Sequence, residues 1–144
     1  MNFSFKNKKI LITGHSGFKG SWLATWLNML GASVTGISLK PKIKPSHFEL
    51  LQLESKIESI MLDITDFKSL NSKINEIKPD YIFHLAAQSI VRTSYEEPIN
   101  TFKTNVIGTI NLLESLKTLT NKCNVILITS DKCYENVEWE YGYR

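Results

Sequence analysis

Short apolar segments alternate along this chain with longer segments whose apolar residues recur at helical spacing. A mostly apolar run without strict alternation is typical of a strand that is buried on both faces of a sheet. Strands that alternate with helices build a parallel sheet through right-handed crossovers. The sequence therefore predicts a doubly wound α/β fold. The expected strands are residues 9–13, 33–38, 57–62, 81–86 and 124–128.

Three helical segments are expected between these strands. The first, over residues 18–30, has apolar residues at steps of three and four, and we place its Trp22 and Trp26 in the core. The second begins at Asp66, a residue type that caps helices, and ends before Pro79. The third has the same spacing, at Phe102, Val106, Ile110, Leu113 and Leu116.

Composition excludes several classes of protein. The 144 residues are 42% hydrophobic and 22% charged, which is the balance of one globular domain spanning residues 1–144. A net charge of +3 is too small to predict a nucleic-acid partner. No apolar run approaches the roughly 18 to 20 residues that cross a membrane. Because Cys123 and Cys133 form neither a disulfide framework nor a metal-ligand pattern, we expect a cytoplasmic protein without a metal.

Gly14, Gly17 and Gly20 separate the first expected strand from the first helix. Ligands of such sheets bind beyond the carboxyl ends of the strands, so the loops after the strands should carry the function. Glycines at this spacing let the backbone approach a pyrophosphate, and amides at the start of the following helix meet its charge. The pattern favours dinucleotide binding over a turn that only connects strand and helix.

The loops after the next two strands leave alternatives open. No carboxylate follows the second strand until Glu49, although an acidic residue there would bind the ribose hydroxyls. Lys40 could instead contact the 2′-phosphate of NADP, or it could be solvated. Asp63, after the third strand, either accepts hydrogen bonds from an adenine amino group or caps a turn.

Several other polar residues have both a structural and a functional interpretation. We expect His84 to be a satisfied core histidine and His15 to belong to the glycine loop rather than to a metal site. The amide of Asn105 could bridge backbone groups near the site. The run from Ser130 to Lys132 offers a hydroxyl, a carboxylate and an amine, which suits acid–base chemistry, although an exposed polar turn would look the same.

Five motifs in order, TGHSGFKGSWL, LDITD, HLAAQSIVRTSY, TNVIGTINLLES and TSDKCY, resemble the extended short-chain dehydrogenase/reductase family. Within it, the chain is most similar to nucleotide-sugar 4,6-dehydratases that act on CDP-glucose. The resemblance implies a Rossmann-type NAD-binding domain and a homodimer when full length. It also implies that this chain ends before the sixth strand and the substrate lobe. The implied NAD contacts are Gly14, Gly17, Phe18, Lys19, Gly20, Asp63, Ile64, Leu85, Ala86, Ala87, Gln88 and Thr104.

The resemblance also implies a reaction, in which C4 of the hexose is oxidised, water leaves across C5–C6, and hydride returns at C6. Ser89 then contacts the substrate, Ser130 bonds the C4 oxygen, and Asp131 protonates the leaving C6 hydroxyl. Lys132 stands where many related dehydratases have a glutamate base; as a base it would need a lowered pKa, and otherwise it has another role.

The family's Tyr-x-x-x-Lys pair is missing, because no tyrosine here has a lysine four residues later. We therefore expect the chain alone to be inactive. One alternative is a non-catalytic module that senses NAD or NADP. Another is a fragment of a sugar-nucleotide 4-epimerase, which Asp131 disfavours because epimerisation expels no water.

Overall fold

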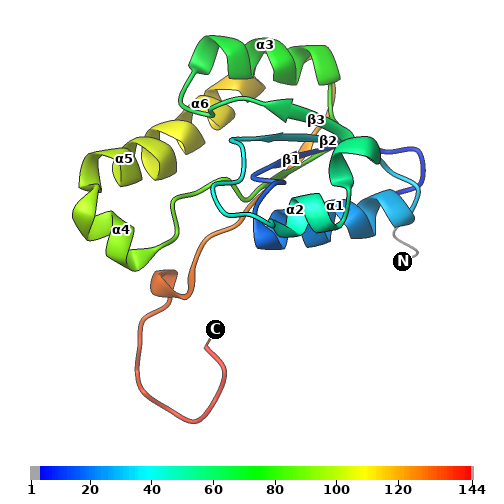
Figure 1. Cartoon of the computed structure of the whole chain (residues 1–144). Coiled ribbons are helices and arrows are strands. Elements are labelled where there is room, and N and C mark those ends of the chain that lie inside the picture. Colours follow the sequence, from blue (N-terminus) through cyan, green and yellow to red (C-terminus); the bar gives the residue numbers. More distant parts are fainter. Residues whose placement is uncertain (1–3, 144) are drawn as a thin grey trace.

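The computed structural model describes residues 4–143 and contains one parallel sheet (Figure 1). Its strand order, β3-β2-β1-β4-β5, reverses direction between β1 and β4, as a doubly wound fold requires. The expected fold class is therefore confirmed. The strands are β1 (Lys9–Thr13), β2 (Ser33–Ser38), β3 (Glu58–Met61), β4 (Tyr81–His84) and β5 (Asn124–Leu127).

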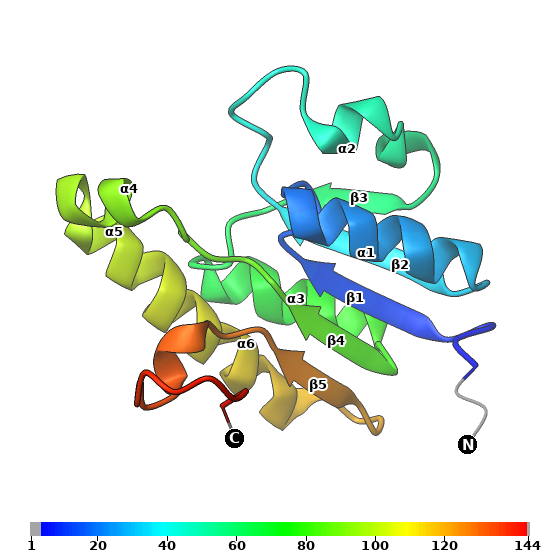
Figure 2. The same cartoon turned by 90° about the horizontal axis from the view of Figure 1, so that it is seen from below.

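Helices cover both faces of the sheet (Figure 2). On one face, α1 (Phe18–Met29) and α2 (His47–Leu50) pack over Ile10 and Ile12 of β1. On the other face, α3 (Phe67–Ile77) and α6 (Gly108–Ser115) pack over Leu11. Neighbouring residues of β1 thus belong to two different cores, which explains its continuous apolar sequence. The remaining elements are η1 (Leu53–Ser55), α4 (Val91–Glu96), α5 (Pro98–Phe102), η2 (Lys103–Ile107), η3 (Leu116–Thr118) and η4 (Asp131–Cys133).

The placement of Trp22 and Trp26 in the core is wrong, since they are 54% and 62% exposed. The buried face of α1 instead carries Gly20, Ser21, Ala24 and Leu27. Small residues are needed there because α1 starts against β1: a Cβ added to Gly20 would lie 2.1 Å from the Gly14 carbonyl oxygen. The bulky side chains therefore occupy the outer face, where the Trp22 ring lies 4.8 Å from that of His47.

The helical stripe at residues 102–113 also faces outward. Phe102 is 69% exposed, whereas Gly108, Asn111, Leu112 and Ser115 are the buried residues of α6. A close approach again sets the face, because a Cβ on Gly108 would lie 2.4 Å from Cδ1 of Ile64. The expected helix is present as one run of α5, the π-helical turn η2, α6 and η3.

The second predicted helix is confirmed in detail. Asp66 caps α3 by accepting the Ser69 N–H at 3.1 Å, and α3 ends at Ile77 before Pro79. Within residues 4–143, none of the helices has the length and apolar character needed to cross a bilayer.

Candidate functional site

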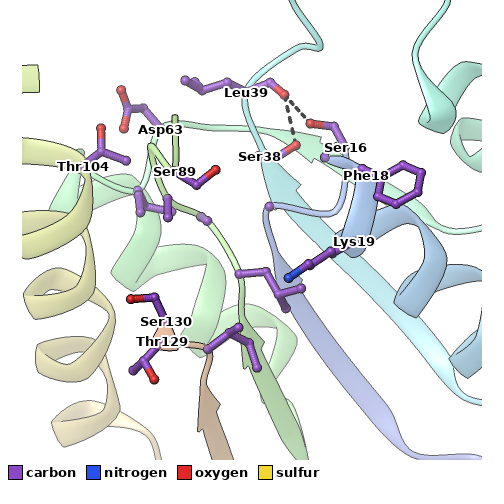
Figure 3. Close-up of a pocket in the computed structure, with 18 of the residues that line it drawn as sticks. Ser16, Phe18, Lys19, Ser38, Leu39, Asp63, Ser89, Thr104, Thr129 and Ser130 are labelled. Carbon is purple, nitrogen blue, oxygen red and sulfur yellow. Dashed lines mark hydrogen bonds between the residues drawn. The ribbon is translucent and has the colours of Figure 1, made fainter. Parts of the chain in front are cut away.

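A cavity of about 860 Å³ lies across the carboxyl ends of the strands (Figure 3). Every strand contributes to it through the loop that follows, which is the arrangement expected for a ligand site in a doubly wound sheet. Its walls are Gly14, Ser16, Gly17, Phe18, Lys19 and Gly20 after β1; Ser38 at the end of β2, with Leu39 and Lys40 after it; Leu62, Asp63 and Ile64 after β3; Leu85, Ala86, Ala87 and Ser89 after β4; Thr104 of η2; and Ile128, Thr129, Ser130 and Asp131 after β5.

The glycine loop after β1 is held tightly against the loop after β4. Gly14 has a φ of +79°, a conformation that favours glycine, and a Cβ there would lie 2.8 Å from the Ala86 nitrogen. Gly17 is the N-cap of α1, and no side chain caps this helix end. The close backbone and the open N-terminus of a twelve-residue helix form a cradle that suits a diphosphate group.

His15 connects this loop to the sheet through a hydrogen bond to β3. Its ring is fully buried, and Nε2 is hydrogen-bonded to Ser59 Oγ at 2.7 Å. The ring lies against Gly36 of β2, where a Cβ would come within 2.2 Å of it. Burial lowers the pKa of His15 to about 4, so the imidazole is neutral at pH 7.

Asp63 is both a turn residue and a cavity residue, so its two expected roles are compatible. Its Oδ1 accepts the Thr65 N–H at 2.8 Å, and the residue lines the cavity. The same loop is held from α6, because Nδ2 of Asn111 donates to the carbonyl oxygens of Ile64 and Thr65 at 3.0 and 3.1 Å.

The loop after β4 is organised by two amides. The expectation that Asn105 bridges backbone groups is confirmed, since its side chain bonds both the N–H and the C=O of Gln88. The Gln88 side chain in turn donates to the Ile90 carbonyl and to Thr101. Behind the loop, His84 is a satisfied core histidine as predicted, with Thr13 at 2.6 Å and Thr109 at 3.0 Å from its ring nitrogens.

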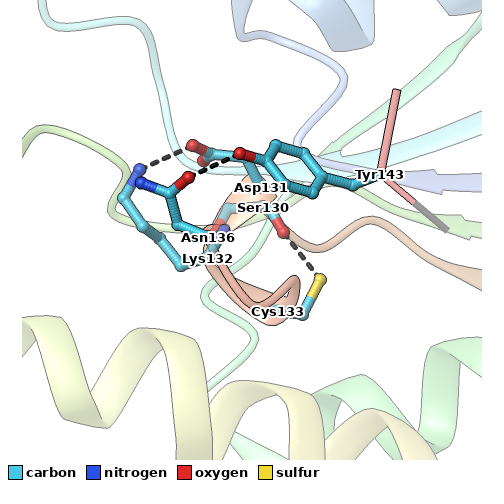
Figure 4. A network of polar contacts seen from close by, with 6 residues as sticks. All are labelled: Ser130, Asp131, Lys132, Cys133, Asn136 and Tyr143. Carbon is cyan, nitrogen blue, oxygen red and sulfur yellow. Dashed lines mark hydrogen bonds and ion pairs between the residues drawn. The ribbon is translucent and has the colours of Figure 1, made fainter. Parts of the chain in front are cut away.

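After β5, the side chains of Asp131 and Lys132 point toward each other beside Ser130 (Figure 4). Ser130 and Asp131 line the cavity, whereas Lys132 does not. Lys132 Nζ lies 2.6 Å from Asp131 Oδ2, in a pair whose side chains are about 80% exposed. The hydrogen bond and charge of Lys132 hold the pKa of Asp131 below its usual range.

All predicted site residues line the cavity except Gln88 and Lys132. The predicted site residues did not include Ser16, Ser38, Leu39, Leu62, Ile128 or Thr129, which also line it. Only their position in the sequence could have indicated them, because each lies at the end of a strand, just after one, or between the loop glycines. Within residues 4–143 no cluster of three or more His, Cys, Asp or Glu residues could hold a metal ion.

A parallel sheet with a glycine loop between β1 and α1, and with a cavity across its carboxyl ends, defines a Rossmann-type nucleotide-binding fold. Comparison with known proteins narrows this class. The model of the GDP-mannose 4,6-dehydratase family matches residues 11–141, and the chain belongs to that family.

The relatives are enzymes of nucleotide-sugar metabolism. The chain is 51% identical over 97% of its length to a CDP-glucose 4,6-dehydratase from Salmonella typhimurium, and 34% identical over 94% to a CDP-paratose 2-epimerase from Salmonella typhi. It spans only 39% and 40% of those two proteins.

Solved structures of nucleotide-sugar epimerases have the same fold as this chain. A UDP-glucose 4-epimerase from Thermotoga maritima, determined with UDP-glucose, has a TM-score of 0.70 and 31% identity over 82% of this chain and 36% of its own. A UDP-glucose 4-epimerase from Thermus thermophilus, solved in complex with NAD, has a TM-score of 0.65 and 27% identity over 76% of this chain and 34% of its own. NAD therefore binds to relatives that share this fold.

Proposed function

We propose that the chain supplies the NAD-binding part, and part of the active site, of an enzyme that dehydrates CDP-glucose to CDP-4-keto-6-deoxyglucose. The observation that carries the proposal is the 51% identity to a CDP-glucose 4,6-dehydratase across nearly the whole chain. The cavity supports it, because it places Ser130 and Asp131 in the same space as the glycine loop.

NAD fits the residues that are present. The diphosphate would lie at the cradle of Gly14, Gly17 and Gly20, beside the N-terminus of α1. The adenine would lie by Asp63 and Ile64, and the nicotinamide by the loop after β4 and Thr104. When bound, NAD supplies an acceptor for hydride and later its donor.

The residues after β5 would act on the hexose. In this proposal the Ser130 hydroxyl donates to the C4 oxygen, Ser89 contacts the substrate, and Asp131 gives its proton to the leaving C6 hydroxyl. A lowered pKa opposes the last role, since a general acid must be protonated at the start. Asp131 therefore works as an acid only if substrate binding raises its pKa, which requires separation from Lys132 and removal of the carboxyl from water. A Lys132 ammonium that is paired with Asp131 is likewise no proton acceptor.

We propose that these 144 residues alone perform no turnover, because they span only 39% of the CDP-glucose 4,6-dehydratase that they match. One test titrates the 144-residue chain with NADH and follows nucleotide fluorescence. A second incubates the chain with NAD and CDP-glucose and measures the 4-keto sugar. We expect binding of NADH and no 4-keto sugar. Formation of that product would contradict the inactivity, and absence of any dinucleotide binding would contradict the proposed function.

A second candidate is a non-catalytic NAD(P)-binding sensor, which would use the same glycine loop and cavity. The two differ in their response to the sugar nucleotide. In equilibrium dialysis, binding of CDP-glucose to the NAD-loaded chain supports the dehydratase proposal and argues against the sensor, whereas NAD binding without CDP-glucose binding is consistent with both. We further propose that the complete protein is cytoplasmic and forms a homodimer. Cell fractionation tests the location, and the molar mass from light scattering tests the dimer.

A further inference from the structure

The ring of His84 is hydrogen-bonded at both of its nitrogens behind the cavity. Nδ1 lies 2.6 Å from Thr13 Oγ1 of β1, and Nε2 lies 3.0 Å from Thr109 Oγ1 of α6. The residue is buried, and burial lowers the pKa of His84, which favours the neutral imidazole. His84 does not line the cavity, so any effect on a ligand must pass through its partners.

The bonds of the two threonines fix which nitrogen of the ring carries the proton. Thr109 donates its hydroxyl to the Asn105 carbonyl oxygen at 2.7 Å, so its own oxygen accepts Nε2–H of His84. Nδ1 then has no proton and accepts the hydroxyl of Thr13, whose oxygen in turn accepts the Ala86 N–H at 3.2 Å. The result is one directed relay of hydrogen bonds, from the Ala86 N–H through the ring of His84 to the Asn105 carbonyl.

Both ends of this relay meet the same wall of the cavity. Ala86 is part of that wall, and the side chain of Asn105 holds the backbone of Gln88 in the same loop. Asn105 also follows Thr104, which lines the cavity from the π-helical turn η2 (Figure 3). A single buried ring therefore connects the loop after β4 to η2.

We propose that His84 is a positioning residue: through its two threonine partners it sets the loop after β4 and the turn η2 at the nicotinamide end of the cavity. Groups that contact a ligand are held precisely when the residues behind them are fixed by packing and hydrogen bonds. A buried polar network whose members are all satisfied supplies that rigidity. The inference rests on the proposed binding of NAD, whose nicotinamide would lie by this loop and Thr104.

The test compares NADH with ADP-ribose, which has the same adenine and diphosphate but no nicotinamide. Calorimetric titration gives both Kd values for the 144-residue chain and its variants. His84→Leu removes both ring bonds, and Thr13→Val removes the hydroxyl between the ring and the Ala86 N–H. We expect each variant to weaken NADH binding by about fivefold or more and ADP-ribose binding by less than about twofold.

The two substitutions together should lose no more than the stronger of them alone, because both interrupt the same relay. Thr13→Ser keeps the hydroxyl and should restore NADH binding. Thr35→Val is the matched control, since Thr35 is also buried in the sheet and donates to Glu58 at 2.9 Å but does not line the cavity. It should leave both Kd values within about twofold.

Nitrogen NMR of the parent chain gives a readout that needs no ligand. Nε2 of His84 should carry the proton and Nδ1 should not, and a proton on Nδ1 alone would overturn the relay.

The binding data separate the remaining outcomes. Equal losses of NADH and ADP-ribose affinity overturn the positioning role, because they report a general loosening of the fold. Unchanged NADH binding in Thr13→Val also overturns it and leaves the proposed function standing, and this variant carries the test alone if His84→Leu does not fold. Failure of the folded parent chain, checked by circular dichroism, to bind either NADH or ADP-ribose overturns both proposals.

Discussion

The Asn105 side chain holds the backbone of Gln88 from both sides. Its Oδ1 accepts the Gln88 N–H at 2.8 Å, and its Nδ2 donates to the Gln88 carbonyl at 2.9 Å. Asn105 lies in the π-helical turn η2, and Gln88 lies in the loop that follows β4. The loop carrying Ala86 and Ala87 is therefore positioned by the helix that runs behind it.

We expect Asn105→Ala to destabilise the chain by about 1–3 kcal/mol, because it leaves a partly buried N–H and C=O of Gln88 without partners. Urea unfolding measures the change. Asn100→Ala is the matched control, since Asn100 bonds only the exposed Glu97 side chain, and we expect a change below about 0.5 kcal/mol. Equal effects of the two substitutions would contradict the bridging role.

The order of elements and most residues of the cavity wall could be predicted from the sequence, because both depend on local signals. Glycines and polar residues after apolar runs marked the cavity wall correctly. The outward position of Trp22 could not be read in this way, because hydrophobic periodicity shows that a helix has an apolar stripe but not which side meets the sheet. That side is set by the approach of α1 to Gly14, a contact made only in the folded chain.

The position of Lys132 was missed for a related reason. Adjacent residues in the sequence were grouped as one cluster with Ser130 and Asp131. In the structure Ser130 and Asp131 line the cavity and Lys132 does not, although its Nζ pairs with the Asp131 carboxylate at 2.6 Å. The ion pair between Lys132 and Asp131 could not be predicted from the sequence either, because it depends on the rotamers of two exposed side chains.

We expect Gly20→Ala to destabilise the chain by about 2 kcal/mol or more, because the new Cβ would overlap the Gly14 carbonyl and push α1 away from β1. Thermal or urea unfolding measures this change. Gly142→Ala adds the same methyl group where no atom lies within 4 Å, and it should leave stability within about 0.5 kcal/mol. A Gly20→Ala variant as stable as the parent chain would argue against this close packing.

Stability should fall with acidification because of His15. Its pKa is about 4 in the folded chain and 6.5 when solvated, so the unfolded state binds a proton first as the pH decreases. The contribution of neutral His15 to the free energy of unfolding is complete above pH 6.5 and is lost as the pH falls from 6.5 to 4. From pH 7 to pH 5 we expect a loss of about 2 kcal/mol from this group.

The matched measurement is urea unfolding of the parent chain and of His15→Gln at both pH values. The variant has no titrating ring at this position, so its stability should change less between pH 7 and pH 5. The remaining slope includes His84, whose pKa is also lowered by burial and which acts in the same direction. Identical slopes for the two proteins would contradict the buried, neutral state of His15.

Lys132 lowers the pKa of Asp131 in the described structure. Because Lys132 Nζ lies 2.6 Å from Asp131 Oδ2, its removal in Lys132→Met should raise the pKa of Asp131 toward the ordinary value of an aspartate. Carboxyl chemical shifts followed by NMR through an acid titration measure this pKa. Lys132→Arg keeps the cation and should keep the pKa low. An Asp131 pKa that does not respond to Lys132→Met would show that the pair does not persist in solution and that Lys132 does not hold this pKa down.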